Sequence, residues 1–202
     1  MPTHRKKRPS VPGGLAIPDH CGDGRGYGGA EGAKNLRVGS GHHTYHRLHL
    51  ATYNARSLKE DAYLAELVSE LGHINWHILG LSEVRRKEED TITLESGHLL
   101  YYREGDKTSQ GGVGILVNKV LSSNVMEVSS VSTRVAYLIL KLTRRYSLKV
   151  IQVYAPTSTH LDDEVEAVYD DITRALHNTT KTHFTVVMGD FNAKVGVQES
   201  GE

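Results

Sequence analysis

The chain has 202 residues, which is enough for one domain of ordinary size with a substantial buried core. Its 24 basic and 24 acidic residues give a formal charge of zero, but residues 1–50 carry eight Lys or Arg against three acids. A basic segment on a mildly acidic body fits a partner such as nucleic acid. Cys21 is the single cysteine, which excludes disulfides within the chain and Cys-based zinc sites.

No apolar run approaches the roughly 18 residues needed to span a bilayer. The basic N-terminus lacks the apolar core of a secretory signal. We therefore expect a protein of the nucleus or the cytoplasm that is neither secreted nor bound to a membrane.

Residues 1–46 are expected to form a disordered leader, with the folded domain at 47–202. Ten glycines fall between Gly13 and Gly41 without helical or strand periodicity. The basic run 5–8 suits a nuclear-import patch or a phosphate-attracting arm, and equally a solvated charge run. A His-rich segment at 42–49 allows metal binding, but without a cysteine partner it favours an incidental cluster.

The first half of the domain reads as strand, helix, strand. Alternation over 48–54 predicts a strand. Ser57 and Glu60 have the spacing of a capping box, and Gly72 suits the position just after a helix, so we expect a helix between them. The apolar run 76–81 predicts a second strand, and the charged run 85–90 predicts an exposed loop.

Further strands are expected at 99–103 and 111–118, and a hairpin at 135–142 and 148–154. Apolar residues spaced by three and four from Leu161 predict an amphipathic helix that ends near Asn178. The run 184–188 predicts a final buried strand that stops at Gly189. This order favours an α/β fold with two layers of sheet and helices outside.

Polar side chains stand where these strands end: Asn54, Glu83, Tyr154, Asp190 and Asn192. Each has a plain alternative, such as a turn residue, the start of a solvated loop, an edge aromatic or an Asx turn. In layered α/β folds, however, ligands bind at strand ends through side chains from different strands. One Glu and one Asp with amide support suit a hard cation, Mg²⁺ with Mn²⁺ as the alternative.

Five segments carry a resemblance to a known family: Thr52–Leu58, Leu81–Arg85, Gly111–Ile115, Val153–Thr157 and Gly189–Gly196. In this order they resemble the motifs of the endonuclease/exonuclease/phosphatase superfamily. Their amino-acid sequences are most similar to those of endonuclease domains of non-LTR retrotransposons, including craniofacial development protein 2-like sequences derived from them. The resemblance covers roughly residues 48–200.

The resemblance implies a four-layered αββα sandwich, DNase I-like, and Mg²⁺-dependent hydrolysis of phosphodiester bonds in DNA. It implies that Glu83 ligates the metal and that Asn54 helps to orient the metal site. Tyr154 and Asn192 would bind the phosphate. Asp190 would orient or deprotonate the attacking water.

The family pattern continues into a Ser-Asp-His motif, and this sequence contains none. We therefore expect a domain whose C-terminal half is missing and whose nuclease activity is impaired. Two alternatives stay open. One is an inactive remnant that keeps a nucleic-acid or protein contact, and the other is a phosphodiesterase of phosphoinositide or sphingolipid headgroups.

Overall fold

The computed structural model describes residues 47–105, 111–157, 162–177 and 183–193. The predicted leader at 1–46, with its basic run, lies outside the described residues, and so does most of the His-rich segment at 42–49. So do the predicted helix end at Asn178 and the end of the last motif, 194–196.

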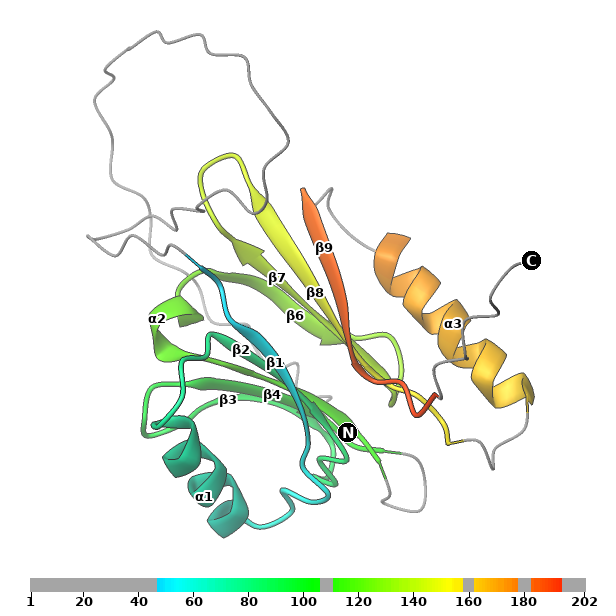
Figure 1. Ribbon diagram of the computed structural model, residues 1–202, viewed down its shortest axis with the longest axis horizontal. Coiled ribbons are helices and arrows are strands. Elements are labelled where there is room, and N and C mark those ends of the chain that lie inside the picture. The colour runs from blue at the N-terminus through cyan, green and yellow to red at the C-terminus, as the bar shows by residue number, and fades with distance from the viewer. Residues whose placement is uncertain (1–46, 106–110, 158–161, 178–182, 194–202) are drawn as a thin grey trace, which may run out of the picture. The chain divides into compact units, whose positions relative to one another are not determined.

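Within these ranges the chain forms nine strands and three helices (Figure 1). They are β1 Leu50–Asn54, α1 Asp61–Leu71, β2 Ile78–Ser82, β3 Glu89–Thr93, β4 Leu99–Arg103, β5 Val113–Val117, α2 Lys119–Ser122, β6 Val125–Ser130, β7 Val135–Lys141, β8 Ser147–Tyr154, α3 Asp162–His177 and β9 Phe184–Asp190.

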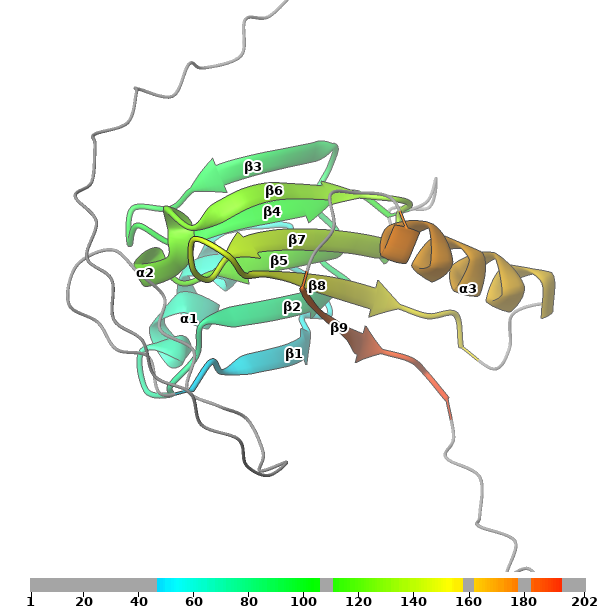
Figure 2. The same ribbon diagram turned by 90° about the horizontal axis from the view of Figure 1, so that it is seen from above.

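The strands form two sheets. One has five strands in the order β1-β2-β5-β4-β3, and the other has four in the order β6-β7-β8-β9. Pairing is parallel between β1 and β2 and between β8 and β9, and antiparallel elsewhere. The two sheets stack so that β1 contacts β9 at one side and β4 contacts β6 toward the other (Figure 2). The carboxyl ends of β1, β2, β8 and β9 all lie at the same end of the stack.

The main core lies between the sheets, and β7 shows how the sequence builds it. Ala136, Leu138 and Leu140 are fully buried among residues of the opposite sheet, such as Ile115. The alternate residues of β7 are buried on its other face, under α3. A strand covered on both faces needs an uninterrupted apolar run, which is why this one was readable from the sequence.

One long helix covers the outer face of each sheet (Figure 1). Leu64 and Leu71 of α1 pack on the five-stranded sheet, and Val168 and Ala175 of α3 pack on the four-stranded sheet. The order helix, sheet, sheet, helix confirms the expected αββα sandwich. No helix among the residues with described positions is long and apolar enough to cross a membrane.

Several local predictions were wrong. Helix α1 starts at Asp61, and its N-cap residue, Glu60, makes no side-chain cap. Ser57 Oγ instead accepts a hydrogen bond from Lys59 N (3.3 Å), so the predicted capping box does not form. The last residues of the predicted loop at 85–90 begin β3, and both α2 and β6 were missed.

Candidate active site

The five polar residues predicted to meet at strand ends do lie at one end of the stack. Asn54 is the last residue of β1, and Glu83 directly follows β2, its parallel partner. Tyr154 and Asp190 are register partners at the ends of β8 and β9. Contacts of β9 with β1 and β2 bring these two pairs of strand ends together across the two sheets.

The Asn54 amide joins the two acidic residues. Its Nδ2 donates to Glu83 Oε1 (2.8 Å) and to Asp190 Oδ2 (3.2 Å). Its Oδ1 accepts from Arg56 N (3.0 Å), which fixes the amide in this orientation. One carboxylate from each sheet is therefore held within hydrogen-bond length of the same nitrogen.

Glu83 sits in a backbone conformation that its surroundings impose. Its φ is 55°, in the left-handed region that non-glycine residues seldom adopt. The next residue, Val84, is pinned from both sides: its carbonyl accepts from Leu58 N (2.8 Å) and its N–H donates to Gly112 O (3.3 Å). Arg85 N donates to Gly111 O (3.1 Å). These contacts aim the Glu83 side chain at the strand ends.

An arginine balances the charge of Glu83. Arg85 Nη2 lies 2.8 Å from Glu83 Oε2, while the other carboxylate oxygen takes the Asn54 amide. The Glu83 side chain is 19% exposed, so a partner for each oxygen offsets the cost of partial burial.

Asp190 makes both contacts that the sequence left as alternatives. Its Oδ1 accepts from Asn192 N (3.1 Å), which is the expected Asx turn. Its Oδ2 accepts from Asn54, which belongs to the site. Asn192 also has a positive φ of 48°, and its Nδ2 donates to Ala155 O (2.7 Å). The turn therefore places the Asn192 backbone N–H on the carboxylate and its side-chain amide on the Ala155 carbonyl.

Tyr154 stands between charges of both signs. Burial raises the pKa of its hydroxyl, Glu83 and Asp190 raise it further, and Arg134 and Arg85 act in the opposite direction. The hydroxyl therefore stays protonated at neutral pH and can donate a hydrogen bond to an anion.

The donor set fits a small hard cation. Glu83 and Asp190 supply two carboxylates, which are ligands that Mg²⁺ takes together with water, while the amide oxygen of Asn54 faces Arg56 N. In the part of the chain with described positions, no group of three or more His, Cys, Asp or Glu side chains converges. Two carboxylates are the number that Mg²⁺ commonly uses.

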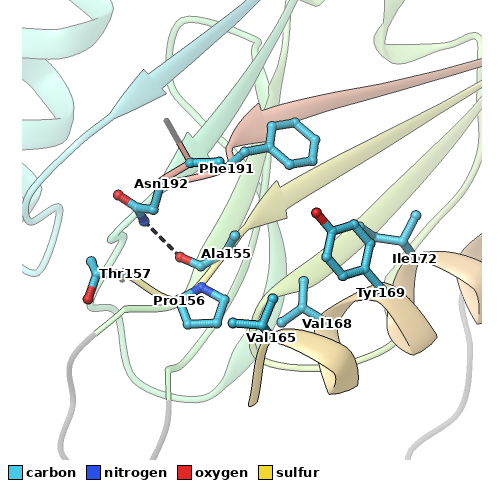
Figure 3. A pocket seen from close by; sticks show the side chains of 10 residues that line it. Ala155, Pro156, Thr157, Val165, Val168, Tyr169, Ile172, Phe191 and Asn192 are labelled. Atoms are coloured by element: carbon cyan, nitrogen blue, oxygen red, sulfur yellow. Dashed lines mark hydrogen bonds between the residues drawn. The ribbon is translucent and has the colours of Figure 1, made fainter. Parts of the chain in front are cut away.

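A hollow of about 180 Å³ lies on the far side of Asn192, between α3 and the exit of β9 (Figure 3). It is lined by apolar side chains of α3, such as Val165 and Ile172, and by Phe191. Asn192 forms part of its wall, with its amide directed at the Ala155 carbonyl. No charged side chain lines this hollow.

Sequence reasoning missed the two arginines that face Tyr154. Arg85 lies inside a motif that the sequence singled out, two residues after Glu83. Arg134 directly precedes β7, and its carbonyl accepts from Tyr154 N (2.8 Å). The predicted hairpin of 135–142 with 148–154 already places residue 134 beside residue 154, and this pairing was the available signal.

Comparison with known proteins gives related sequences and folds. The family model described as "Endonuclease/Exonuclease/phosphatase family" matches residues 51–196. Craniofacial development protein 2 of Tragulus javanicus is 31% identical over 150 residues, which are 74% of this chain and 26% of that protein. The chain thus spans about a quarter of the length of this curated relative.

Two solved structures have the same fold. The endonuclease domain of TRAS1, a telomere-specific non-LTR retrotransposon, aligns with a TM-score of 0.52 and 14% identity. The alignment covers 74% of this chain and 61% of that domain. The 3′ phosphatase NExo from Neisseria, bound to a product DNA hairpin, aligns with a TM-score of 0.54 and 20% identity. This alignment covers 72% of this chain and 58% of NExo.

The family match spans most of the chain, and the described strand-end residues of its motif segments lie at one end of a DNase I-like sandwich. This chain belongs to the endonuclease/exonuclease/phosphatase family.

Proposed function

We propose that the chain hydrolyses phosphodiester bonds in DNA with the help of Mg²⁺ or Mn²⁺ and produces a nick that ends in a 3′-hydroxyl, as in retrotransposon endonucleases. The observation that carries the proposal is the bridge made by the Asn54 amide. It holds Glu83 and Asp190, one from each sheet, at a single point beside Tyr154. Family membership and the DNA-bound neighbour NExo support this choice of substrate.

Glu83 would ligate the cation, and Asn54 would help to orient the metal site, because its amide nitrogen holds the Glu83 carboxylate. A bound divalent cation offsets the negative charge that builds on the phosphoryl oxygens during hydrolysis. The contacts on either side of Val84 fix the Glu83 backbone, so little rearrangement is needed to present its carboxylate.

The remaining residues act on water and phosphate. Asp190 is a carboxylate anchored by an Asx turn, and it would orient or deprotonate the attacking water. The protonated hydroxyl of Tyr154 and the amide of Asn192 would donate to phosphate oxygens. Each residue ends or follows a strand, which limits its movement.

The proposal assigns no side chain to protonate the leaving oxygen. Of the described histidines, His49, His77 and His183 directly precede β1, β2 and β9, whose carboxyl ends are at the site, so these three lie at the opposite end of the stack. Protonation would then come from water. Since a positioned general acid contributes about 10²–10⁴-fold, we propose a correspondingly slow reaction.

The test is nicking of supercoiled plasmid by the full chain in Mg²⁺. Asp190→Asn and Glu83→Gln should each lower the rate by about 10²-fold or more, and chelation of the metal should abolish it. Asp170→Asn, on the exposed face of α3, is the control for a lost negative charge and should nick as the unaltered chain does.

Nicking that survives chelation, or that is equal in the Asp190→Asn and Asp170→Asn proteins, would contradict the proposal. Duplex binding without nicking would support the non-catalytic alternative. Release of headgroups from phosphoinositide or sphingomyelin vesicles, with no plasmid nicking, would support the lipid alternative.

A further inference from the structure

Arg134 is held against the candidate site by its backbone and by an aromatic ring. Its carbonyl accepts from Tyr154 N (2.8 Å), and its guanidinium carbon lies 5.5 Å from the centre of the Tyr154 ring. A hydrogen bond from its N–H to Ser132 Oγ (3.2 Å) shapes the turn that precedes β7. These contacts keep a half-buried cation at the strand ends.

The charge of Arg134 has no counter-ion among the described residues. Three other arginines at this end form ion pairs, Arg85 with Glu83, Arg86 with Asp61 and Arg103 with Glu89, and Arg56 is exposed to solvent. The Arg134 guanidinium makes no ion pair within the described ranges, although partial burial deprives it of some hydration. A planar, partly desolvated guanidinium that lacks a carboxylate is suited to bind a phosphate through two parallel hydrogen bonds.

We propose that Arg134 binds a backbone phosphate of the DNA strand whose neighbouring phosphate lies at Tyr154. This proposal rests on the proposed function, because it takes the strand ends as the place of the reacting phosphate. It assigns Arg134 to substrate binding. The ligand of the site is then at least two consecutive phosphates of one DNA strand, and not a single phosphate group.

The competing interpretation is structural: Arg134 stacks on Tyr154 only to fix the ring. Two substitutions separate the readings. Arg134→Gln removes the charge but keeps a planar group, whereas Arg134→Lys keeps the charge and loses the planar fork. A phosphate contact depends on the charge, and its loss lowers the salt dependence of binding, which a ring-packing role does not affect.

The experiment measures binding of the full chain to a fluorescently labelled DNA duplex by anisotropy, with EDTA present so that no cleavage occurs. We expect Arg134→Gln to weaken binding about tenfold and to lower the slope of log affinity against log salt by about 0.9. Arg134→Lys should keep the slope. Arg145→Gln, exposed in the turn at the other end of the β7–β8 hairpin, is the matched control and should bind as the unaltered chain does.

The inference is overturned if Arg134→Gln and Arg145→Gln bind alike, or if the unaltered chain does not bind the duplex. The basic leader is common to all variants, so its contribution cancels in the comparison. Because the assay needs no turnover, the two proposals fail separately. DNA binding that depends on Arg134, without nicking, rejects the proposed hydrolysis and supports the phosphate contact. Nicking together with binding that does not depend on Arg134 supports hydrolysis and rejects the phosphate contact.

Discussion

Gly80 on β2 and Gln152 on β8 set the spacing of the two sheets just below the candidate site, and Gly80→Ala tests this. A Cβ added at Gly80 would lie 2.5 Å from Gln152 Cδ and 3.0 Å from Met188 Cε. Carbon atoms pack best at about 3.5–4.0 Å, so Gln152 must leave its position. Gln152 is fully buried, and its Nε2 donates to Ser82 Oγ (3.2 Å) across the sheets.

The cost follows from these contacts. Breaking the bond to Ser82 leaves buried polar groups unpaired, at about 1–3 kcal/mol, and forcing the two sheets to repack adds about 1–3 kcal/mol. The reduced freedom of the unfolded chain with Ala returns about 0.4–1 kcal/mol. We therefore expect Gly80→Ala to lower the free energy of unfolding by about 1–5 kcal/mol. Since β2 and β8 lead to Glu83 and Tyr154, nicking per folded molecule should also fall.

The assay is urea unfolding followed by the fluorescence of Trp76, the single tryptophan, which is 6% exposed. Gln152→Ala makes room for the new methyl group, so the double variant should be more stable than the sum of the two single effects predicts, by about 1–3 kcal/mol. Additive effects, or a loss below about 0.5 kcal/mol for Gly80→Ala, would refute this account.

Three further predictions follow from other contacts. Lys149 is 2% exposed, and its Nζ donates to the Ala175 carbonyl near the end of α3 (2.8 Å). Lys149→Met should therefore lower the free energy of unfolding, measured in urea, by about 1–3 kcal/mol. An unchanged urea midpoint would contradict this prediction. Burial lowers the pKa of His77 from 6.5, so the folded state binds fewer protons than the unfolded chain. The free energy of unfolding should therefore decrease as the pH falls below about 6.5, and His77→Gln should flatten this dependence. Gly111→Ala combines a φ of 90° with a Cβ 3.2 Å from Tyr154 Cε1, so it should reduce both stability and nicking, whereas Gly97→Ala, with a φ of 83° far from the site, should reduce stability alone.

The sequence predicted the elements that are buried on both faces and those that alternate strongly. It also predicted β9, but the expected burial was wrong, because β9 is an edge strand whose residues are exposed or partly exposed. Strands β5, β7 and β8 read as apolar runs because a sheet or helix covers each face. It did not predict β3 and β6, the edge strands on the same side of the two sheets. Edge strands are only partly covered, and their sequences carry charges and serines that resemble loops. A contact from Ser130 Oγ to Glu89 Oε1 (3.1 Å) joins these edges, and no local pattern indicates it.

The site could be predicted in its members but not in its contacts. Parallel strands carry their final residues to one end, so the meeting of Asn54, Asp190 and Tyr154 follows from strand order. The orientation of the Asn54 amide depends on a hydrogen bond from Arg56 N. The choice of Arg85 as the ion-pair partner of Glu83 depends on the path of the loop that follows β2. Both are set by tertiary hydrogen bonds that periodicity does not encode.

The bridge by Asn54 lowers the cost of holding Glu83 and Asp190 close together across the two sheets. Like charges a few ångströms apart repel by on the order of 4 kcal/mol at an effective dielectric constant of about 20. One amide that donates to Glu83 and Asp190 offsets part of this repulsion, and the Arg85 guanidinium offsets more. Because the amide carries no net charge, the formal charge of Glu83, Asp190 and Arg85 together is −1, which attracts a divalent cation. Under the proposed function, neutral hydrogen bonds and one ion pair would hold these two carboxylates in place for a cation.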